Sequence, residues 1–401
     1  MLEYISYIVC FGTLLVVLGF IYIRLKYGFW VLQPVFHVYD IGYMFNPPGI
    51  IDHSLPNTNK YVNLKDIGTL SLAQLTSIQQ SKFIQLIRSH YLQNKDNVFS
   101  PTAENILPYF VGHTDTSIVS FFYQDHSLLD TKTNEIVTDR QIIGAITSRP
   151  MDIHIYNDKS NADAKLRAYY VDYLCVDTLH RKRGIAPQLI QTHHYNQRRN
   201  NPRIAVSLFK REDELTGIVP LCVYSTYGFP VDTWTQPPDM SGAFKLLSIN
   251  ATNFRIVYDF VRLHSRQFDI VIQTDMANLL ELIKTHNVFV YAILCDNDIV
   301  ACYFYRKSCV QIERGMETLS LFASIRGCEE DIFVHGFKIS FWKIAAEHFF
   351  GFAALENISH NNTIIHHIML KTKPRIVSPT AYYFYNFAYP TFAPEKVLLL
   401  N

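Results

Sequence analysis

Charged residues are scarce in this chain, and neither sign dominates. Only 18% of its 401 residues are charged, whereas 49% are hydrophobic, and 36 Lys and Arg balance 35 Asp and Glu. Such a composition excludes a disordered or charge-driven protein. The formal net charge of +1 argues against broad nucleic-acid binding, which needs a basic surface. The length suffices for two packed halves.

Paired cysteines are also missing. Seven cysteines are scattered along the chain, an odd number, and none forms a C-x-x-C pair. This pattern excludes a disulfide framework and a cysteine zinc site, and it fits free thiols in a reducing compartment. Two histidine pairs, His193-His194 and His366-His367, lack Cys or Glu at ligand spacing. We therefore expect no metal and interpret these histidines as ordinary surface or packing residues.

The N-terminus carries a long uncharged run. From Tyr4 to Ile23 no residue is charged, and 20 residues at ~1.5 Å each reach ~30 Å, the thickness of a bilayer core. Basic residues follow the run at 24 and 26, so the positive-inside rule puts the rest of the chain in the cytosol. We predict a single-pass membrane anchor over residues 1–25, with 4–23 in the bilayer.

Two alternatives to this anchor were weighed. A cleaved signal peptide would have a shorter apolar core, basic residues before it and an A-x-A cleavage site after it. A buried core helix is the other alternative, since a run that is apolar on all sides and has no polar face also fits a large core. Neither alternative fits the run as well as an anchor does.

The remaining chain alternates helical and strand patterns. A Pro-containing stretch with little periodicity covers residues 26–60 and is expected to be an extended arm. Beyond it, two regions, 61–227 and 228–401, each mix apolar runs of helical and strand type. The pattern predicts an α+β fold in two halves, with mixed sheets flanked by helices. No literal repeat relates the halves.

A basic turn at residues 181–186 carries the first chemical signal. It joins a strand-like run, 168–176, to a helix-like run opened by Pro187. A Gly-containing turn at a helix N-terminus can cradle a pyrophosphate, because backbone N–H groups and the helix dipole favour an anion. Its pattern, Arg-x-x-Gly-x-Ala, is similar to the acyl-CoA loop of the GNAT superfamily. A plain basic turn that caps a helix is the alternative.

Six further stretches, in order along the chain, resemble the N-myristoyltransferases (glycylpeptide N-tetradecanoyltransferases) of that superfamily. They are residues 29–35 (F-W-V-L-Q-P-V), Tyr91 with 96–99 (D-N-V-F), 150–156 (P-M-D-I-H-I-Y), 173–176 (Y-L-C-V), 185–187 (I-A-P), and 385–386 with the tail 395–401 (E-K-V-L-L-L-N). The resemblance runs from about residue 29 to the last residue and leaves out the predicted anchor.

The resemblance implies two tandem GNAT-like halves. The first half, 61–227, would bind acyl-CoA, and the second half, 228–401, would supply most of a peptide groove. The implied reaction moves a myristoyl group from myristoyl-CoA to the α-amine of an N-terminal glycine, by direct attack and without a covalent enzyme intermediate. Acyl-CoA and glycine-initiated peptides or proteins are the expected partners, myristoyl-CoA is a substrate, no permanently bound cofactor is expected, and we expect a monomer.

The resemblance also assigns the catalytic groups. Backbone amides of Tyr173 and Leu174 would stabilise the developing oxyanion. The α-carboxylate of Asn401 would be the base that takes a proton from the glycine ammonium. A free tail is the alternative, but the apolar run 398–400 favours a buried end. Cys175 is interpreted as a small packing residue and not as a nucleophile.

Binding residues follow in the same way. The implied acyl-CoA contacts are Phe29, Trp30, Arg181, Lys182, Arg183, Gly184, Ile185 and Ala186. The implied peptide contacts are Tyr91, Asp96 and Tyr224.

Departures from the family gather on the peptide side. The acidic loop is thinned to Asp96 beside Lys95, a groove histidine corresponds to Thr226, and a threonine near the substrate amine corresponds to Leu208. A glycine-rich acidic turn is replaced by residues 376–379. A shifted peptide selectivity is therefore expected.

Two other functions stay open: an acyltransferase for another amine, such as a lysine or a small molecule, and a catalytically silent acyl-CoA-binding membrane protein.

Overall fold

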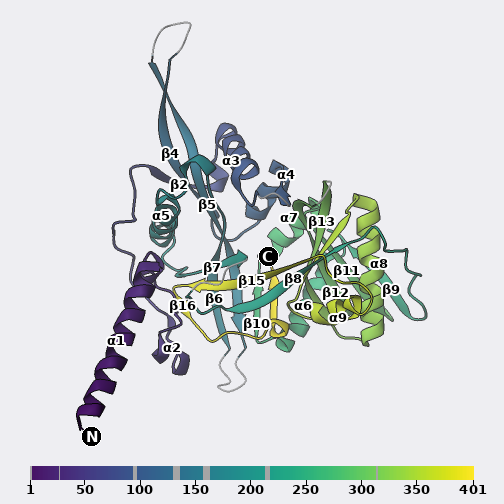
Figure 1. The fold of residues 1–401 in the computed structure, drawn as a ribbon. Coiled ribbons are helices and arrows are strands. Elements are labelled where there is room, and N and C mark those ends of the chain that lie inside the picture. The colour runs from purple at the N-terminus through teal and green to yellow at the C-terminus, as the bar shows by residue number, and fades with distance from the viewer. Residues whose placement is uncertain are drawn as a thin grey trace.

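The computed structural model describes residues 2–26, 28–93, 97–129, 136–156, 163–212, 217–312 and 315–401. A large twisted sheet runs through the whole body, with helices on its faces (Figure 1). The sheet contains parallel and antiparallel pairs, for example β6 with β7 and β5 with β6. The predicted α+β class with a mixed sheet is confirmed.

The helices and strands alternate along the chain. The α-helices are α1 (Leu2–Lys26), α2 (Ile41–Phe45), α3 (Ser77–His90), α4 (Ala103–Ile106), α5 (Ile185–Asn200), α6 (Phe254–His264), α7 (Met276–Lys284), α8 (Glu330–His348) and α9 (Asn361–Met369). The strands are β1 (Gly49–Ile50), β2 (Ile67–Ser71), β3 (Asn97–Phe99), β4 (Ile118–Leu129), β5 (Ile136–Ile155), β6 (Ala164–Val176), β7 (Val206–Glu212), β8 (Cys222–Pro230), β9 (Phe244–Ile249), β10 (Ile270–Gln273), β11 (Val288–Cys295), β12 (Asp298–Ile312), β13 (Met316–Arg326), β14 (Phe352–Glu356), β15 (Ile376–Tyr385), β16 (Phe387–Ala388) and β17 (Val397–Leu400).

The strand order ties the two predicted halves together. It reads β17-β10-β5-β6-β7-β15-β8-β14-β13-β12-β11-β9, with β4 beside β5, β2 beside β4 and β3 beside β12. Strands β10, β15 and β17 come from beyond residue 228, yet β10 pairs with β5 and β15 pairs with β7. The two predicted halves therefore share one continuous sheet. A boundary at residue 228 stays a prediction.

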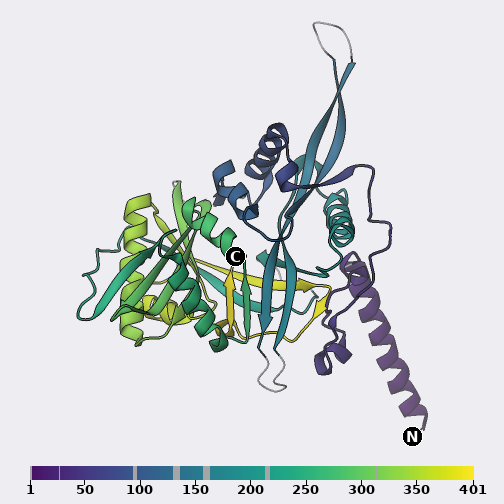
Figure 2. The ribbon, with the colours of Figure 1, turned by 180° about the vertical axis from the view of Figure 1, so that it is seen from behind.

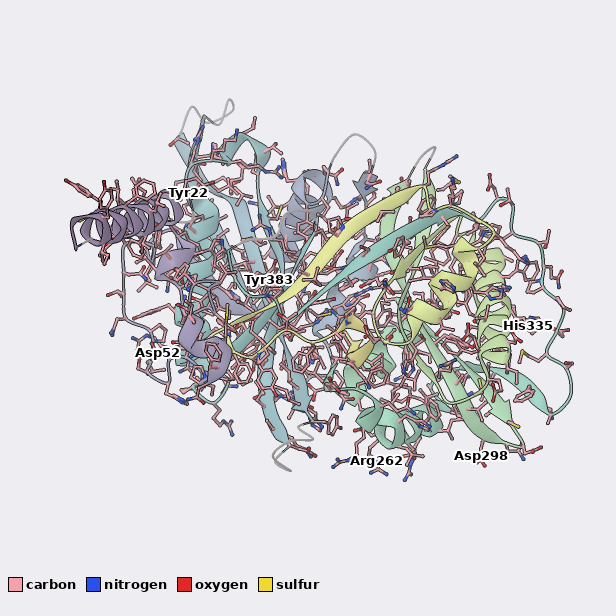
Figure 3. The ribbon with its side chains drawn as sticks, turned by 60° about the horizontal axis from the view of Figure 1, so that its bottom comes forward. Tyr22, Asp52, Arg262, Asp298, His335 and Tyr383 are labelled. Carbon is pink, nitrogen blue, oxygen red and sulfur yellow. The ribbon has the colours of Figure 1, made fainter. Side chains whose placement is uncertain are left out.

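Helix faces are fitted closely to the sheet. α5 buries Ile185 and Leu189 against β5, where Gly144 leaves the room that Leu189 needs. α8 buries Phe333, Phe337 and other apolar side chains against β11 and β12. Figure 3 labels Tyr383 near the middle of the sheet, and its ring stacks on that of Phe209 at 5.3 Å.

The arm at residues 26–60 lies along the sheet and contains short elements. One 3-10 turn covers Trp30–Leu32, α2 follows, and β1 pairs with β16. The hydroxyl of Tyr385 donates a 2.6 Å hydrogen bond to Gln33, which fixes the start of the arm on β15.

Helix α1 projects away from the body (Figure 1). Its apolar side chains are strongly exposed, for example Tyr4 at 77% and Val16 at 72%. Among the described residues, however, no helix is both long and apolar enough to cross a membrane. The predicted membrane-spanning segment at residues 4–23 is therefore not supported.

An arginine with three carboxylate partners connects the halves. Arg167 on β6 binds Asp115 at 2.6 Å, Asp152 at 2.7 Å and Asp275 at 2.7 Å. Asp275 stands directly before α7, in the second half. Burial alone would raise the pKa of Asp275, but hydrogen bonds from His113 and Arg167 hold it well below the usual carboxyl range.

We predict that Arg167→Gln lowers the free energy of unfolding by about 2 kcal/mol at neutral pH, since it leaves partly buried carboxylates without their cation. A carboxylate with a lowered pKa stabilises the fold above the pKa of an unfolded Asp, near ~4, and this stabilisation is lost as pH falls. The difference from the unaltered chain should therefore shrink below about pH 4. Urea unfolding at neutral and acidic pH measures both effects.

The control is Arg266→Gln, because Arg266 pairs with Asp163 while its side chain is 73% exposed. This change should cost less than about 0.5 kcal/mol. Equal losses in the two variants would contradict a connecting role for Arg167.

Candidate active site

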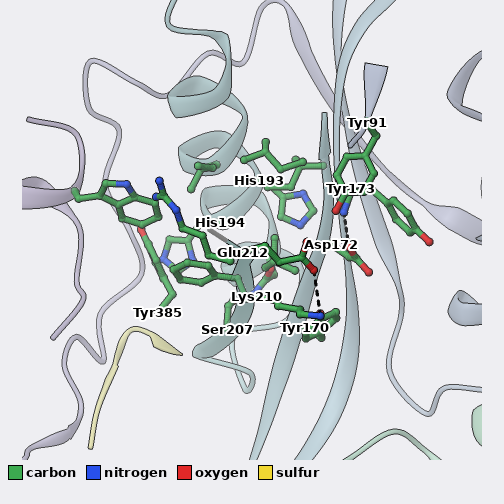
Figure 4. Close-up of a pocket in the computed structure, with 18 of the residues that line it drawn as sticks. Tyr91, Tyr170, Asp172, Tyr173, His193, His194, Ser207, Lys210, Glu212 and Tyr385 are labelled. Carbon is green, nitrogen blue, oxygen red and sulfur yellow. Dashed lines mark hydrogen bonds and ion pairs between the residues drawn. The ribbon is translucent and has the colours of Figure 1, made fainter. Parts of the chain in front are cut away.

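The sheet opens where β6 and β7 part. The two strands pair in parallel from Ala168 with Val206 to Val171 with Phe209, and the pairing stops there although both strands continue. Between the continuing ends lies a cavity of about 430 Å³, called here the strand cavity (Figure 4). Backbone groups beyond the last pair have lost their ladder partners and can bind a ligand instead.

A β-bulge forms the inner wall of the strand cavity. Thr147 on β5 pairs with Asp172 and Ala145 pairs with Cys175, so Tyr173 and Leu174 together oppose one residue. Tyr173 has φ 48°, in the left-handed region that non-glycine residues seldom adopt. Such a backbone is held only where the surrounding structure enforces it, and it often marks a functional position.

The bulge amide already has an acceptor. The N–H of Tyr173 donates a 2.8 Å hydrogen bond to Oδ1 of Asp172 (Figure 4). Tyr173 and Leu174 both line the strand cavity, as an oxyanion site requires. Their catalytic role stays a prediction, and an oxyanion at Tyr173 would have to replace the Asp172 carboxylate.

Two adjacent histidines of α5 form another wall. His193 bridges Ser120 at 2.8 Å and Ser148 at 3.0 Å through its two ring nitrogens. Burial lowers the pKa of His193, and likewise that of His194, to about 3, so both rings are neutral. The sequence predicted ordinary surface or packing residues. Both are buried, as packing residues are, and they also line the cavity, a position that has no local sequence signal.

The arm contributes one aromatic ring to the strand cavity. Trp30 lines the cavity and stacks on Phe209 at 5.6 Å with an interplanar angle of 12°. Phe29 packs edge-on against Trp30 and Tyr61 and is not among the lining residues. Of the two acyl-CoA contacts predicted in the arm, only Trp30 therefore reaches this cavity.

The basic turn lies at the start of α5, outside the cavity lining. Gly184 is the residue before the helix and has φ +76°, a conformation that favours glycine. Residues 181–184 are exposed, Ile185 is buried and Ala186 is half-buried. Arg181 donates from Nε to the Val176 carbonyl at 3.1 Å and from its guanidinium to the His90 carbonyl. Arg181 thus secures the turn, which leaves Lys182 and Arg183 as its outward cations.

A second cavity, of about 350 Å³, adjoins the first and is called here the groove cavity. Its walls come from both halves, including β6, β7, β12 and β14. The residues that line both cavities are Tyr91, Leu92, Tyr170, Asp172, Tyr173, Lys210 and Glu212. The two cavities therefore meet at the bulge, where a group in one can reach a group in the other.

A buried carboxylate organises the far wall of the groove cavity. Glu356 accepts hydrogen bonds from the Tyr224 hydroxyl at 2.6 Å and from Arg306 at 2.9 Å. Lys210 lies 3.8 Å from Glu356 and 3.3 Å from Glu212. Burial alone would raise the pKa of Glu356, but the charges of Lys210 and Arg306 hold it below its usual value.

The predicted peptide contacts have different positions. Tyr91 lines both cavities, with its ring 5.5 Å from that of Tyr173. Tyr224 is buried behind Glu356 and is not among the lining residues of either cavity. Asp96 lies outside the described residues. The sequence reasoning missed Glu356 and Arg306, which carry no motif and come from distant strands.

The end of the chain is buried at the centre of the molecule (Figure 2). β17 pairs in parallel with β10 through all four of its residues, and Asn401 is 2% exposed. Oδ1 of Asn401 accepts a 3.1 Å hydrogen bond from Arg306, which lines the groove cavity. The expected burial of the tail is confirmed, whereas its role as a base stays a prediction.

Comparison with known proteins gives structural matches without sequence matches. No family profile matches the chain, and no curated protein sequence does. A structure of Saccharomyces cerevisiae N-myristoyltransferase with bound myristoyl-CoA aligns with a TM-score of 0.68 at 12% identity, covering 91% of this chain and 94% of that one. Another, with myristoyl-CoA and inhibitors, gives 0.67 at 12% identity and covers 92% of each chain. The chain therefore has the N-myristoyltransferase fold, in a divergent form.

Proposed function

We propose that this protein is an acyltransferase that moves a myristoyl group from myristoyl-CoA to the α-amine of an N-terminal glycine. The observation that carries the proposal is the strained bulge at Tyr173, where the strand cavity and the groove cavity meet. The fold shared with yeast enzyme structures that hold myristoyl-CoA supports the donor. One cavity serves the acyl donor, and the other serves the peptide.

The chemistry follows from this junction. The amine nitrogen attacks the thioester carbonyl at the bulge, the new N–C bond forms, and the C–S bond breaks as CoA leaves as a thiol, which takes up the second proton of the amine. The amides of Tyr173 and Leu174 stabilise the oxyanion that forms between these steps. The α-carboxylate of Asn401 takes the proton from the glycine ammonium, whose pKa is near ~8.

No enzyme nucleophile takes part. Burial raises the pKa of the Cys175 thiol, next to the bulge, to about 12, so it is protonated at neutral pH. A buried thiol in this state is a packing group. The acyl group therefore passes directly from sulfur to nitrogen.

CoA is held outside the reacting centre. Trp30 packs on it from the arm, and the turn at 181–186 receives the pyrophosphate. Backbone N–H groups at the start of α5, together with Lys182 and Arg183, supply the positive potential.

A second function has one observation in its favour. The Asp172 carboxylate occupies the Tyr173 amide and would repel an oxyanion there. A catalytically silent acyl-CoA-binding protein would tolerate this arrangement, and transfer assays separate the two functions. Acyl transfer to another amine, such as a lysine or a small molecule, is the remaining alternative.

We expect the full chain to transfer labelled myristate from myristoyl-CoA to peptides that begin with glycine, and not to the same peptides with alanine in its place. The amide product should resist hydroxylamine, which cleaves thioesters. Acyl-CoA binding without transfer would favour the silent protein. Equal labelling of peptides that carry only a lysine amine would favour the other acyltransferase.

We expect one added residue after Asn401 to lower transfer at least about hundredfold, since the carboxylate is displaced from its buried position. Myristoyl-CoA binding should be unchanged. The control is Asn401→Ala, which keeps a terminal carboxylate and loses only the bond to Arg306. Full activity of the extended chain would overturn the assignment of the base.

Asp172→Asn tests the other carboxylate at the junction. It keeps an acceptor for the Tyr173 amide and removes a negative charge beside the oxyanion, so transfer should rise, by roughly tenfold. A loss of transfer of similar size to that in the extended chain would make Asp172 the base.

We also propose that the chain attaches to a bilayer through α1, with both cavities on the cytosolic side. Support comes from the exposed apolar side chains of this helix, such as Tyr7 at 74% and Phe11 at 62%. The attachment would bring the acyltransferase to the surface where acylated products reside.

The full chain should float with lipid vesicles, and a chain that lacks residues 1–25 should stay in the dense fraction. Vesicle flotation with equal amounts of both proteins measures this. Flotation of the shortened chain would contradict attachment through α1.

A further inference from the structure

One buried cation in the groove cavity has no anionic partner among the described residues. Arg149 on β5 is 2% exposed and lines the groove cavity. Its Nε and Nη1 atoms are buried without a hydrogen-bond partner. Among the described residues, the guanidinium instead lies over two aromatic rings, 4.7 Å from the ring centre of Tyr109 and 5.0 Å from that of Tyr170.

The other cations that line this cavity are paired. Arg306 bonds to Glu356, Lys210 lies beside Glu212 and Glu356, and Lys307 lies 3.4 Å from Glu317. Among the acidic residues of the lining, Asp172 accepts from the Tyr173 amide and makes no ion pair within the described part of the chain. Glu212 and Glu356 are thus held by other cations and Asp172 by the Tyr173 amide, so no carboxylate pairs with Arg149 within the described part of the chain.

An unpaired buried charge is unfavourable. Removing a guanidinium from water costs free energy, which a carboxylate or hydrogen bonds normally offset. Contacts with aromatic faces offset only part of this cost. A site kept in this state is prepared for an anion that arrives from outside.

We propose that Arg149 binds the carboxylate of an acidic side chain of the peptide substrate. The proposal rests on the proposed function in taking the groove cavity as the peptide site. A planar guanidinium offers a pair of parallel donors that matches a carboxylate. The two tyrosine faces fix the plane of the guanidinium before the substrate arrives.

The position of Arg149 determines which residue of the peptide substrate it can contact. Tyr170, which stacks on the guanidinium, also lines the strand cavity, and so belongs to the junction of the two cavities. The acidic residue therefore follows closely behind the N-terminal glycine. A lysine at that place would be repelled.

The test uses the full chain loaded with a non-hydrolysable myristoyl-CoA analogue. Short glycine-initiated peptides carry either Glu or Gln at each of the first few places after the glycine, and calorimetry gives each dissociation constant. We expect Glu to bind about tenfold tighter than Gln at one place, the usual size for a charge-assisted hydrogen bond. In Arg149→Met this preference should vanish.

Arg140→Met is the matched control. Arg140 also lies over a tyrosine face, that of Tyr123 at 4.8 Å, but its side chain is 58% exposed and pairs with Asp125. The preference for Glu should persist in this variant.

Arg149→Lys is a second test variant. It keeps the charge and loses the planar donors, so it should retain a reduced preference for Glu. It serves as the test if Arg149→Met fails to fold.

Glu and Gln peptides that bind alike at every place would overturn the proposal, as would an unchanged preference in either Arg149 variant. The transfer assay is read separately. A preference for Glu without transfer to any peptide refutes the proposed function and leaves the acidic-residue site standing. Transfer to glycine-initiated peptides without a preference for Glu supports the proposed function and refutes the acidic-residue site.

Discussion

The parting of β6 and β7 is the constraint on which the rest of the site depends. Each strand is held on its outer side, β6 by β5 and β7 by β15, so the two can diverge without loss of the sheet. Past Val171 and Phe209 the diverging ends leave backbone groups and side chains facing one another across the strand cavity. A ligand that enters there replaces the missing strand pairing.

The bulge lies where this opening meets the groove cavity. Tyr173 and Leu174 share one opposing position on β5, and Tyr173 lines both cavities. The second half supplies the charged groups on the far wall of the groove cavity. Glu356, Arg306 and Asn401 come from β14, β12 and the chain end, and direct hydrogen bonds join them. The interlocked strand order makes this meeting possible.

The charges in the groove cavity are unevenly balanced. Lys210 and Arg306 are balanced by Glu356 and Glu212, whereas Arg149 is not balanced. Such a cavity differs in its charge requirement from one that favours basic peptides. At 12–13% identity to the yeast structures, the fold is kept.

The sequence by itself determined the features that depend on neighbouring residues. These include the α+β class, the strand at 168–176, the turn with Gly184 before α5, and the burial of the apolar tail. Hydrophobic periodicity and turn chemistry act over a few residues, so they can be read from the chain. The N-terminal run was also read as a membrane-crossing segment, which the described helices do not support.

Only the tertiary structure decided which residues form the cavities. It brought His193 and His194 to the strand cavity, set Tyr224 behind Glu356, left Phe29 out of the lining, and buried Arg149 without an anion. These placements depend on strand order and register among segments that are not neighbours in the chain. A carboxylate and a guanidinium attract each other only once the fold has brought them within a few ångströms, and no local pattern in the chain encodes that distance.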